Sequence, residues 1–142
     1  MCAVSPHPPL LIPDVGRDSI RRVKRTQEAM RELGRRVREA EPDAIVLISP
    51  HAPVFRDAVA ILSAQQLRGD FRAFAAPHVS LSFPCDLELS DGIAEEAKSR
   101  KIPVVMLDEK AIRRYGTASL LDHGTLVPMY YIAEAGTRVP LV

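Results

Sequence analysis

The sequence lacks tryptophan, has only two cysteines and contains no long apolar run. Cys2 and Cys85 do not have the spacing of a metal-binding knuckle or of a disulfide framework, so we expect a reducing, cytoplasmic setting. No window approaches the roughly 18 uninterrupted apolar residues of a membrane span, so we expect no membrane segment. The apolar run at residues 10–12 is too short for a signal peptide and is enclosed by prolines.

The sequence also has no excess of either charge. It contains 19 Lys and Arg and 18 Asp and Glu, for a net charge of +1. This balance argues against a general nucleic-acid-binding chain. Residues 17–38 alone are basic, with nine Arg or Lys against three Asp or Glu. No aromatic residue is interleaved there, so we interpret this stretch as the solvated face of a helix rather than as an RNA- or anion-binding surface.

The most apolar segment, residues 44–48, is typical of a strand buried on both faces. Ser49 and Pro50 follow it, and a proline cannot continue the hydrogen-bonded ladder of a central strand. His51 is therefore expected at the carboxyl end of that strand, where open α/β sheets bind their ligands.

The rest of the chain alternates between strand and helix patterns. With 142 residues it is long enough for one domain with a core. The alternation predicts an α/β fold with a mostly parallel, mixed sheet and helices on both faces. The expected elements are strands at 1–4, 58–62, 104–108 and 138–142, helices at 18–41, 90–98 and 129–135, and a loop with short strand pieces, including His78, at 65–83.

A short pattern occurs twice, as Ser5-Pro6-His7 and as Ser49-Pro50-His51, each time after an apolar run. Two parallel strands that end in this way place two imidazoles side by side at one sheet edge. The flanking prolines restrict the backbone, and a rigid support favours a preorganised metal site. The structural alternative is a pair of ordinary loop histidines.

A third histidine, His123, lies between Asp122 and Gly124. Glycine allows close approach of the backbone to a ligand. Thr125 is the expected N-cap of the following helix, with Pro128 in its first turn. The helix dipole disfavours an imidazolium at this position, and a neutral imidazole can act as a general base, whereas Asp122 acts in the opposite direction.

Together these segments resemble the class III extradiol ring-cleavage dioxygenases, in particular the LigB-like catalytic subunit and its relatives, which include the Memo proteins. The resemblance spans nearly the whole chain in the right order. It is carried by three segments: Pro6-His7-Pro8-Pro9; Ser49-Pro50-His51 with residues 53–57; and Asp122-His123-Gly124-Thr125 with Pro128.

The resemblance implies a non-haem Fe(II) enzyme that opens a catecholic ring with O₂; zinc or another divalent metal is the alternative ion. Imidazoles suit Fe(II), and two of them with one carboxylate leave positions open for other ligands. In that family the first two histidines bind the metal and the later one is an acid/base residue. Carried over, this makes His7 and His51 the metal ligands, His123 the catalytic base, and Pro53, Phe55, Asp122 and Gly124 the residues around the substrate.

The family's third ligand is a carboxylate in a C-terminal region that this chain does not have. Residues 1–142 are therefore expected to form a single LigB-like domain that is the N-terminal part of a longer family domain. Asp86, Asp108 and His78 are possible substitute ligands, and their spacing selects none of them. A truncated sheet exposes an unpaired edge, so we expect a homo-oligomer, a missing C-terminal portion or a partner chain.

Two other functions use the same residues. The first is a non-catalytic, Memo-like binding module on the same fold, which needs no metal. The second is a hydrolase with a bound divalent metal such as zinc, which needs no oxygen.

Overall fold

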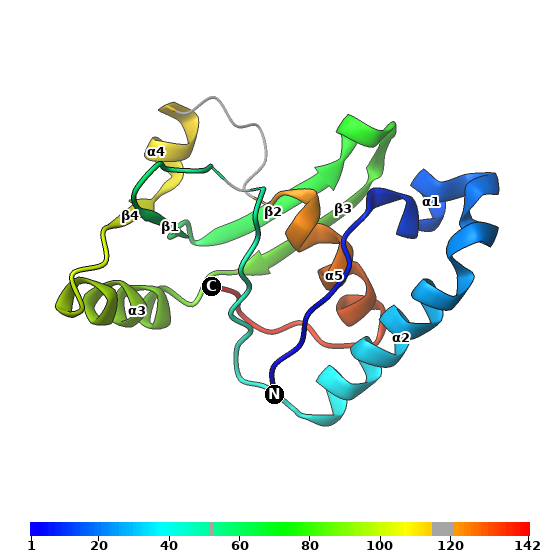
Figure 1. Cartoon of the computed structure of the whole chain (residues 1–142), viewed down its shortest axis with the longest axis horizontal. Coiled ribbons are helices and arrows are strands. Elements are labelled where there is room, and N and C mark those ends of the chain that lie inside the picture. Colours follow the sequence, from blue (N-terminus) through cyan, green and yellow to red (C-terminus); the bar gives the residue numbers. More distant parts are fainter. Residues whose placement is uncertain (52, 115–120) are drawn as a thin grey trace.

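The computed structural model describes residues 1–51, 53–114 and 121–142. Short helical turns follow the N-terminal segment and lead into a long helix, and the strands come later in the chain (Figure 1). In order, the elements are η1 (Pro9–Leu11), α1 (Pro13–Gly16), η2 (Arg17–Val23), α2 (Lys24–Glu39), β1 (Val59–Leu62), β2 (Gln66–Phe71), η3 (Arg72–Phe74), β3 (Ala76–Pro84), α3 (Leu87–Ser99), β4 (Val104–Leu107), α4 (Glu109–Arg114) and α5 (His123–Glu134).

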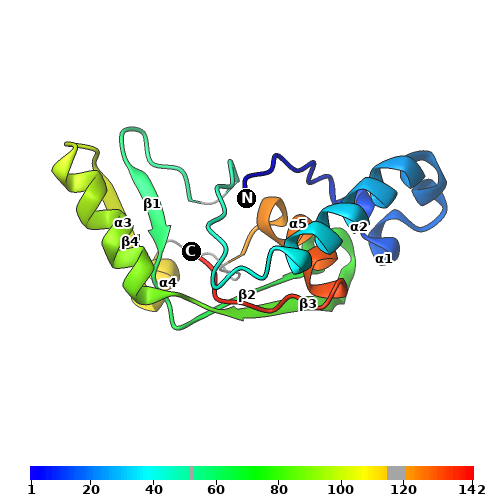
Figure 2. The ribbon, with the colours of Figure 1, turned by 90° about the horizontal axis from the view of Figure 1, so that it is seen from below.

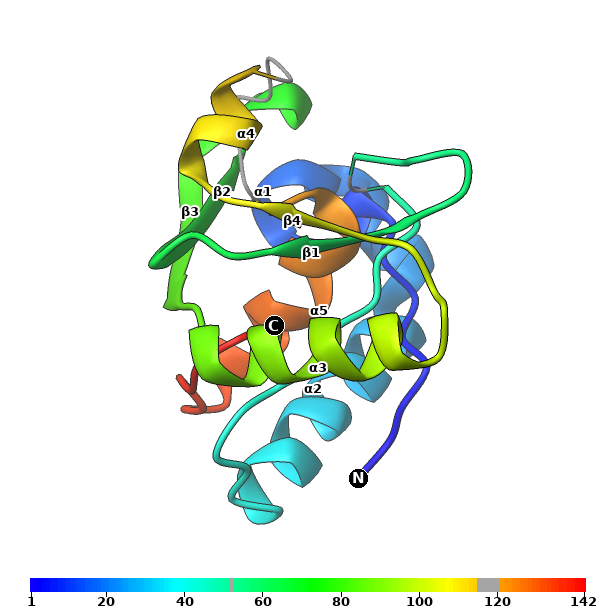
Figure 3. The same ribbon diagram turned by 90° about the vertical axis from the view of Figure 1, so that its left-hand side faces the viewer.

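The fold is α/β, with a parallel sheet and helices, as the sequence predicts. Strands β1 and β4 pair in parallel, from Val59 opposite Val104 to Leu62 opposite Leu107. Helix α3 precedes β4 in the chain and packs against both strands of this pair (Figure 3). A second pair, β2 and β3, is antiparallel, which makes the strand pairing mixed.

The prediction of a loop with short strand pieces at residues 65–83 is wrong in its loop part. Nearly all of this segment belongs to the β2–β3 hairpin. Leu67, Gly69 and Phe71 are buried at alternate positions of β2, which is the period of a strand with one face on the core. The hairpin turns through η3 and then Ala75, whose φ of 59° lies in the left-handed region. Gly69 and Pro77 in this stretch mask the alternation in the sequence.

The prediction that residues 44–48 form a central strand buried on both faces is also wrong. The segment is extended and pairs with the C-terminal residues: Ile45 N–H donates to the Pro140 carbonyl, and Leu47 N–H to the Val142 carbonyl. The side chains of Val46 and Ile48 face solvent, with exposed fractions of 54% and 93%. The apolar residues indicate an extended conformation correctly. The segment, however, pairs along one edge only, with the C-terminal residues.

The expected strand at residues 1–4 is not formed either. This segment has no regular secondary structure, and the side chain of Val4 is fully exposed. The predicted strand at 138–142 is reduced to bridges of Leu141 with Ile45 and with Cys85. Each of these segments was identified from apolar residues alone, and β pairing needs a second strand in register.

Helix α5 is the centre of the core. It packs against α2 on one side and against β2 and β3 on the other (Figure 2). Most of its residues are buried, including Leu126, Met129 and Tyr131, which is the pattern of an interior helix. Gly34 of α2 marks a close approach of the two helices, because a Cβ there would lie 2.5 Å from the Tyr131 carbonyl oxygen.

Helix α2 confirms the long basic helix, although residues 17–23 form the 3-10 helix η2 instead of its first turns. Met30, Gln27 and Gly34 are buried on its inner face, while most of its arginines are exposed. Within residues 1–51, 53–114 and 121–142, no helix combines the length and apolarity needed to cross a bilayer.

Two helix caps differ from those expected. Asp86 caps α3, upstream of the start expected at residue 90, and its carboxylate accepts a hydrogen bond from Leu89 N–H. Asp122, rather than Thr125, caps α5, with bonds from the N–H groups of Gly124 and Thr125. Each cap lies further upstream because an aspartate three residues before a helical N–H can satisfy it directly.

Candidate functional site

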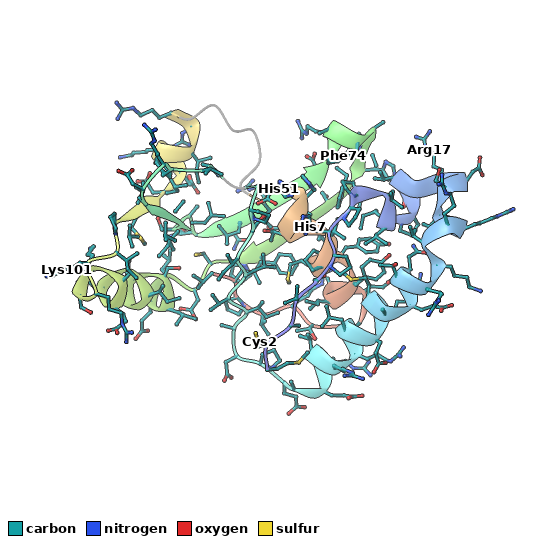
Figure 4. All side chains as sticks on the ribbon, viewed as in Figure 1. Cys2, His7, Arg17, His51, Phe74 and Lys101 are labelled. Atoms are coloured by element: carbon teal, nitrogen blue, oxygen red, sulfur yellow. The ribbon has the colours of Figure 1, made fainter. Side chains whose placement is uncertain are left out.

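Three imidazoles from three separate segments meet at one place. His7 Nε2 lies 3.0 Å from His51 Nε2. The ring of His51 stacks on that of His123, with centroids 4.2 Å apart and 29° between the planes. The ring centroids of His7 and His123 are 6.0 Å apart. Figure 4 shows His7 and His51 side by side in the middle of the molecule.

A buried polar contact fixes the chain that follows His7. The Leu11 carbonyl accepts hydrogen bonds from Gln27 Nε2 at 2.8 Å and from the Tyr131 hydroxyl at 2.5 Å. These donors come from α2 and α5, so the turn η1 is attached to both helices. Prolines on either side of His7 restrict the short connection between this anchor and the imidazole.

The segment that carries His51 is attached to the start of α5. The Ser49 hydroxyl donates to Asp122 Oδ1 at 2.7 Å and accepts from His51 N–H at 3.3 Å. Gly124 makes room for this contact, since a Cβ there would lie 3.1 Å from His51 Cδ2 and would collide with the Ser49 hydroxyl. The close approach predicted for Gly124 is thus an approach to the His51 loop.

His123 is the first residue of α5 and is half-buried. Partial burial lowers the pKa of its imidazole, and the nearby imidazoles of His51 and His7 lower it further, whereas the Asp122 carboxylate opposes the shift. The ring is therefore neutral near pH 7 and able to accept a proton. Desolvation, rather than the helix dipole alone, keeps it neutral.

Phe74 is a residue of the site that the sequence analysis missed. Its ring meets that of His123 edge to face, with centroids 5.4 Å apart, and it lies on η3 at the tip of the hairpin (Figure 4). The alternation of Leu67, Gly69 and Phe71 with polar residues would have predicted a strand here. That strand would have indicated the hairpin and hence the position of Phe74. Ser49 is a second such residue, because the sequence pattern includes it but predicts no function for it.

The other predicted residues lie as follows. Pro53 and Phe55 follow His51 in the chain and are half-buried. His78 is an exposed residue of β3, and its Nε2 lies 2.8 Å from Asp14 Oδ1. Asp86 and Asp108 accept hydrogen bonds from the N–H groups of Leu89 and Ala111, at the starts of α3 and α4.

The pair of imidazole nitrogens has a separation that suits a shared ion. Two ligands at right angles, each with a metal–nitrogen bond of about 2.1 Å, are about 3.0 Å apart. The same distance fits an N–H···N hydrogen bond between neutral rings. Within the described parts of the chain, no group of three or more His, Cys, Asp or Glu side chains could hold a metal ion. The 3.0 Å separation of His7 Nε2 and His51 Nε2 is thus compatible with either contact.

The α/β fold and the three imidazoles agree with the sequence comparison. Residues 1–142 match the family described as the catalytic LigB subunit of aromatic ring-opening dioxygenase, and the chain belongs to this family. Dioxygenases of this family generally use a divalent metal.

The chain is also similar to a bacterial protein, Protein CA_C1420 of Clostridium acetobutylicum. The two are 33% identical over 127 residues, which cover 89% of this chain and 27% of the relative. The chain thus spans about a quarter of the length of the curated relative that it matches.

Proposed function

We propose that this chain forms the histidine-bearing part of an extradiol ring-opening dioxygenase in which His7 and His51 bind Fe(II). The observation that carries the proposal is the 3.0 Å separation of the two Nε2 atoms, which come from segments 44 residues apart. Membership of the LigB family supports the reaction class. Imidazole nitrogen is a ligand that Fe(II) accepts, together with a carboxylate, in oxygenases of the facial-triad type.

The residues of the chain have separate tasks in this proposal. When bound, the ion supplies Lewis acidity toward the catechol oxygens and a place for O₂. His123, neutral because it is partly buried, accepts the proton that a catechol hydroxyl loses. Phe74 provides an apolar ring next to this base. Pro53, Phe55, Asp122 and Gly124 are proposed to surround the substrate, with Asp122 and Gly124 acting from the start of α5.

The third metal ligand is proposed to come from outside the three-histidine cluster, as a carboxylate of a longer chain or of a partner. Residues 1–142 then form one LigB-like domain that is the N-terminal part of a longer one. The exposed Val46 and Ile48 are the proposed contact for that further chain or for a second copy. A monodisperse monomer in light scattering contradicts the second copy.

Anaerobic titration of the full-length gene product with Fe(II), followed by catechol and then oxygen, tests the proposal. We expect one ion per chain and the absorbance of a ring-opened product. His7→Ala and His51→Ala lose iron binding, His123→Gln keeps iron and loses turnover, and the surface variant His78→Ala keeps both. Absence of iron binding by the wild-type protein refutes the proposal. Zinc, rather than iron, after purification under argon indicates the hydrolase.

One observation favours a second candidate, a non-catalytic binding module of the Memo-like kind. The described residues supply two clustered imidazole nitrogens and no complete ligand group. In this case the Nε2–Nε2 contact is a hydrogen bond within the three-histidine cluster, beside which Phe74 lies. Binding of an aromatic ligand without metal, unchanged in His7→Ala, supports this candidate over the dioxygenase.

A further inference from the structure

We propose that Ser49 is a positioning residue that holds the imidazole of His51 against that of His123 through Asp122. This inference rests on the proposed function where it concerns metal binding, and on geometry alone where it concerns the two rings. The Ser49 hydroxyl lies between the backbone of His51 and the cap of α5. Nothing in the family description or in the name of the relative assigns this residue a role.

The first step of the argument is the direction of the hydrogen bonds. Ser49 Oγ donates to Asp122 Oδ1 at 2.7 Å and accepts from His51 N–H at 3.3 Å. A hydroxyl can do both at once, since it has one donor and two acceptor sites. A bond to an ionised carboxylate is stronger than a bond between neutral groups. The backbone of His51 is thus connected by two consecutive bonds to the residue that caps α5.

The second step is the rigidity of the other end. Asp122 Oδ1 also accepts hydrogen bonds from Gly124 N–H at 2.5 Å and Thr125 N–H at 3.3 Å. Helix α5 is buried along most of its length, so the cap is fixed to the core. His123 is the next residue after Asp122 and moves with it. The hydroxyl of Ser49 therefore ties the more exposed imidazole to a ring mounted on the core.

The third step is the space around the contact. A Cβ at Gly124 would lie 2.7 Å from Asp122 Oδ1 and 3.1 Å from His51 Cδ2, and would collide with Ser49 Oγ. An added methyl group at Gly124 would therefore have to displace these side chains. His51 itself is exposed, and its segment, residues 44–48, is paired along one edge. The Ser49 hydroxyl is thus a polar link between this exposed segment and the start of α5.

Ser5 provides an internal comparison, because it has the same place in the other Ser-Pro-His pattern. Its hydroxyl donates to the Pro6 carbonyl at 3.1 Å and lies 3.3 Å from Met30 Sδ. These contacts join it neither to Asp122 nor to a histidine. The repeated pattern in the sequence thus has different contacts at its two sites. A role in joining two imidazoles belongs to Ser49 and not to Ser5.

The test uses the 142-residue chain and two readouts. In the metal-free protein, nuclear Overhauser contacts between the ring protons of His51 and His123 report the stacking. Under argon, Co(II) serves as a spectroscopic probe of the metal affinity. We expect Ser49→Ala to lose the ring contacts and, since loss of an outer-shell partner typically costs about 10–100-fold in metal affinity, to bind Co(II) more weakly by that factor.

Four further variants sharpen the result. Ser49→Thr keeps the hydroxyl and restores both readouts. Asp122→Asn keeps an N-cap acceptor but weakens the bond from Ser49, so it gives a partial loss. Ser5→Ala, and Ser99→Ala at the end of α3, leave the ring contacts unchanged.

Retention of the ring contacts in a folded Ser49→Ala overturns the inference. If the wild-type chain binds no Co(II) while Ser49→Ala still loses the contacts, the positioning role stands, and the metal proposal is decided separately by the Fe(II) titration of the full-length gene product.

Discussion

Replacement of Gly34 by alanine tests the packing that places the site. Gly34 lies in α2 where that helix meets α5, and an added Cβ would be 2.5 Å from the Tyr131 carbonyl oxygen and 3.0 Å from Ala135 Cβ. The nearest atom belongs to backbone, which cannot rotate away as a side chain does. The two helices therefore have to separate to admit the methyl group. Tyr131 also holds the Leu11 carbonyl, so the shift is transmitted toward His7.

Two opposing effects set the size of the change. Alanine is favoured over glycine inside a helix by about 1 kcal/mol. Insertion of an extra carbon into a packed core costs about 1–3 kcal/mol. Because the contact is with backbone, we take the upper part of that range, and expect Gly34→Ala to lower the free energy of unfolding by about 1–2 kcal/mol. Gly92 in α3 is the matched control, since nothing lies within 4 Å of its added Cβ.

Urea unfolding followed by circular dichroism measures both variants. Gly92→Ala is expected to stabilise the chain by up to about 1 kcal/mol, so the two midpoints move in opposite directions. The slopes should stay equal, because neither change alters the surface exposed on unfolding. If Gly34→Ala is stabilised as much as Gly92→Ala, the close approach of α2 and α5 is refuted.

Three further predictions concern the site and the thiols. Gly124→Ala should fold with little loss of stability, since the contacted side-chain atoms can shift, but should displace His51 and weaken Co(II) binding; unchanged affinity contradicts the geometry. Cys85 should react with a disulfide reagent more slowly than Cys2 and only at higher pH, because burial raises the pKa of the Cys85 thiol, whereas Cys2 is exposed; equal rates contradict this. Tyr131→Phe removes two buried hydrogen bonds, the one that the hydroxyl donates to the Leu11 carbonyl and the one that it accepts from Gln27 Nε2, and should cost about 1–3 kcal/mol in urea unfolding; a stability equal to that of the wild type contradicts these bonds.

Much of the helical structure was predictable from local pattern. The apolar stripe of the basic segment places Met30 on the inner face of α2, and the run after Pro103 forms β4. The helix α5 was predicted too, although with Thr125 as its N-cap, whereas the structure begins it at His123. These features depend on neighbours within a few residues, and such neighbours are fixed by the sequence.

The errors in the predicted strands concern pairing between distant segments. Residues 44–48 have the composition of a buried strand, yet the structure pairs Ile45 and Leu47 with the C-terminal segment along one edge. Residues 65–83 combine a glycine and a proline with a true alternation, and the hairpin is evident only once β2 and β3 are opposite one another. Composition gives a tendency to extend, whereas a strand requires a partner in register.

The sequence by itself determined the ingredients of the site: two proline-stiffened histidines in a repeated pattern, and a third at the start of a helix. Tertiary structure alone decided that His7 and His51 meet nitrogen to nitrogen, that His51 stacks on His123, and that Phe74 and Ser49 join them. The physical reason is distance along the chain. Contacts between residues far apart in sequence depend on how α2, α5 and the hairpin pack together, and that packing is a property of the whole core.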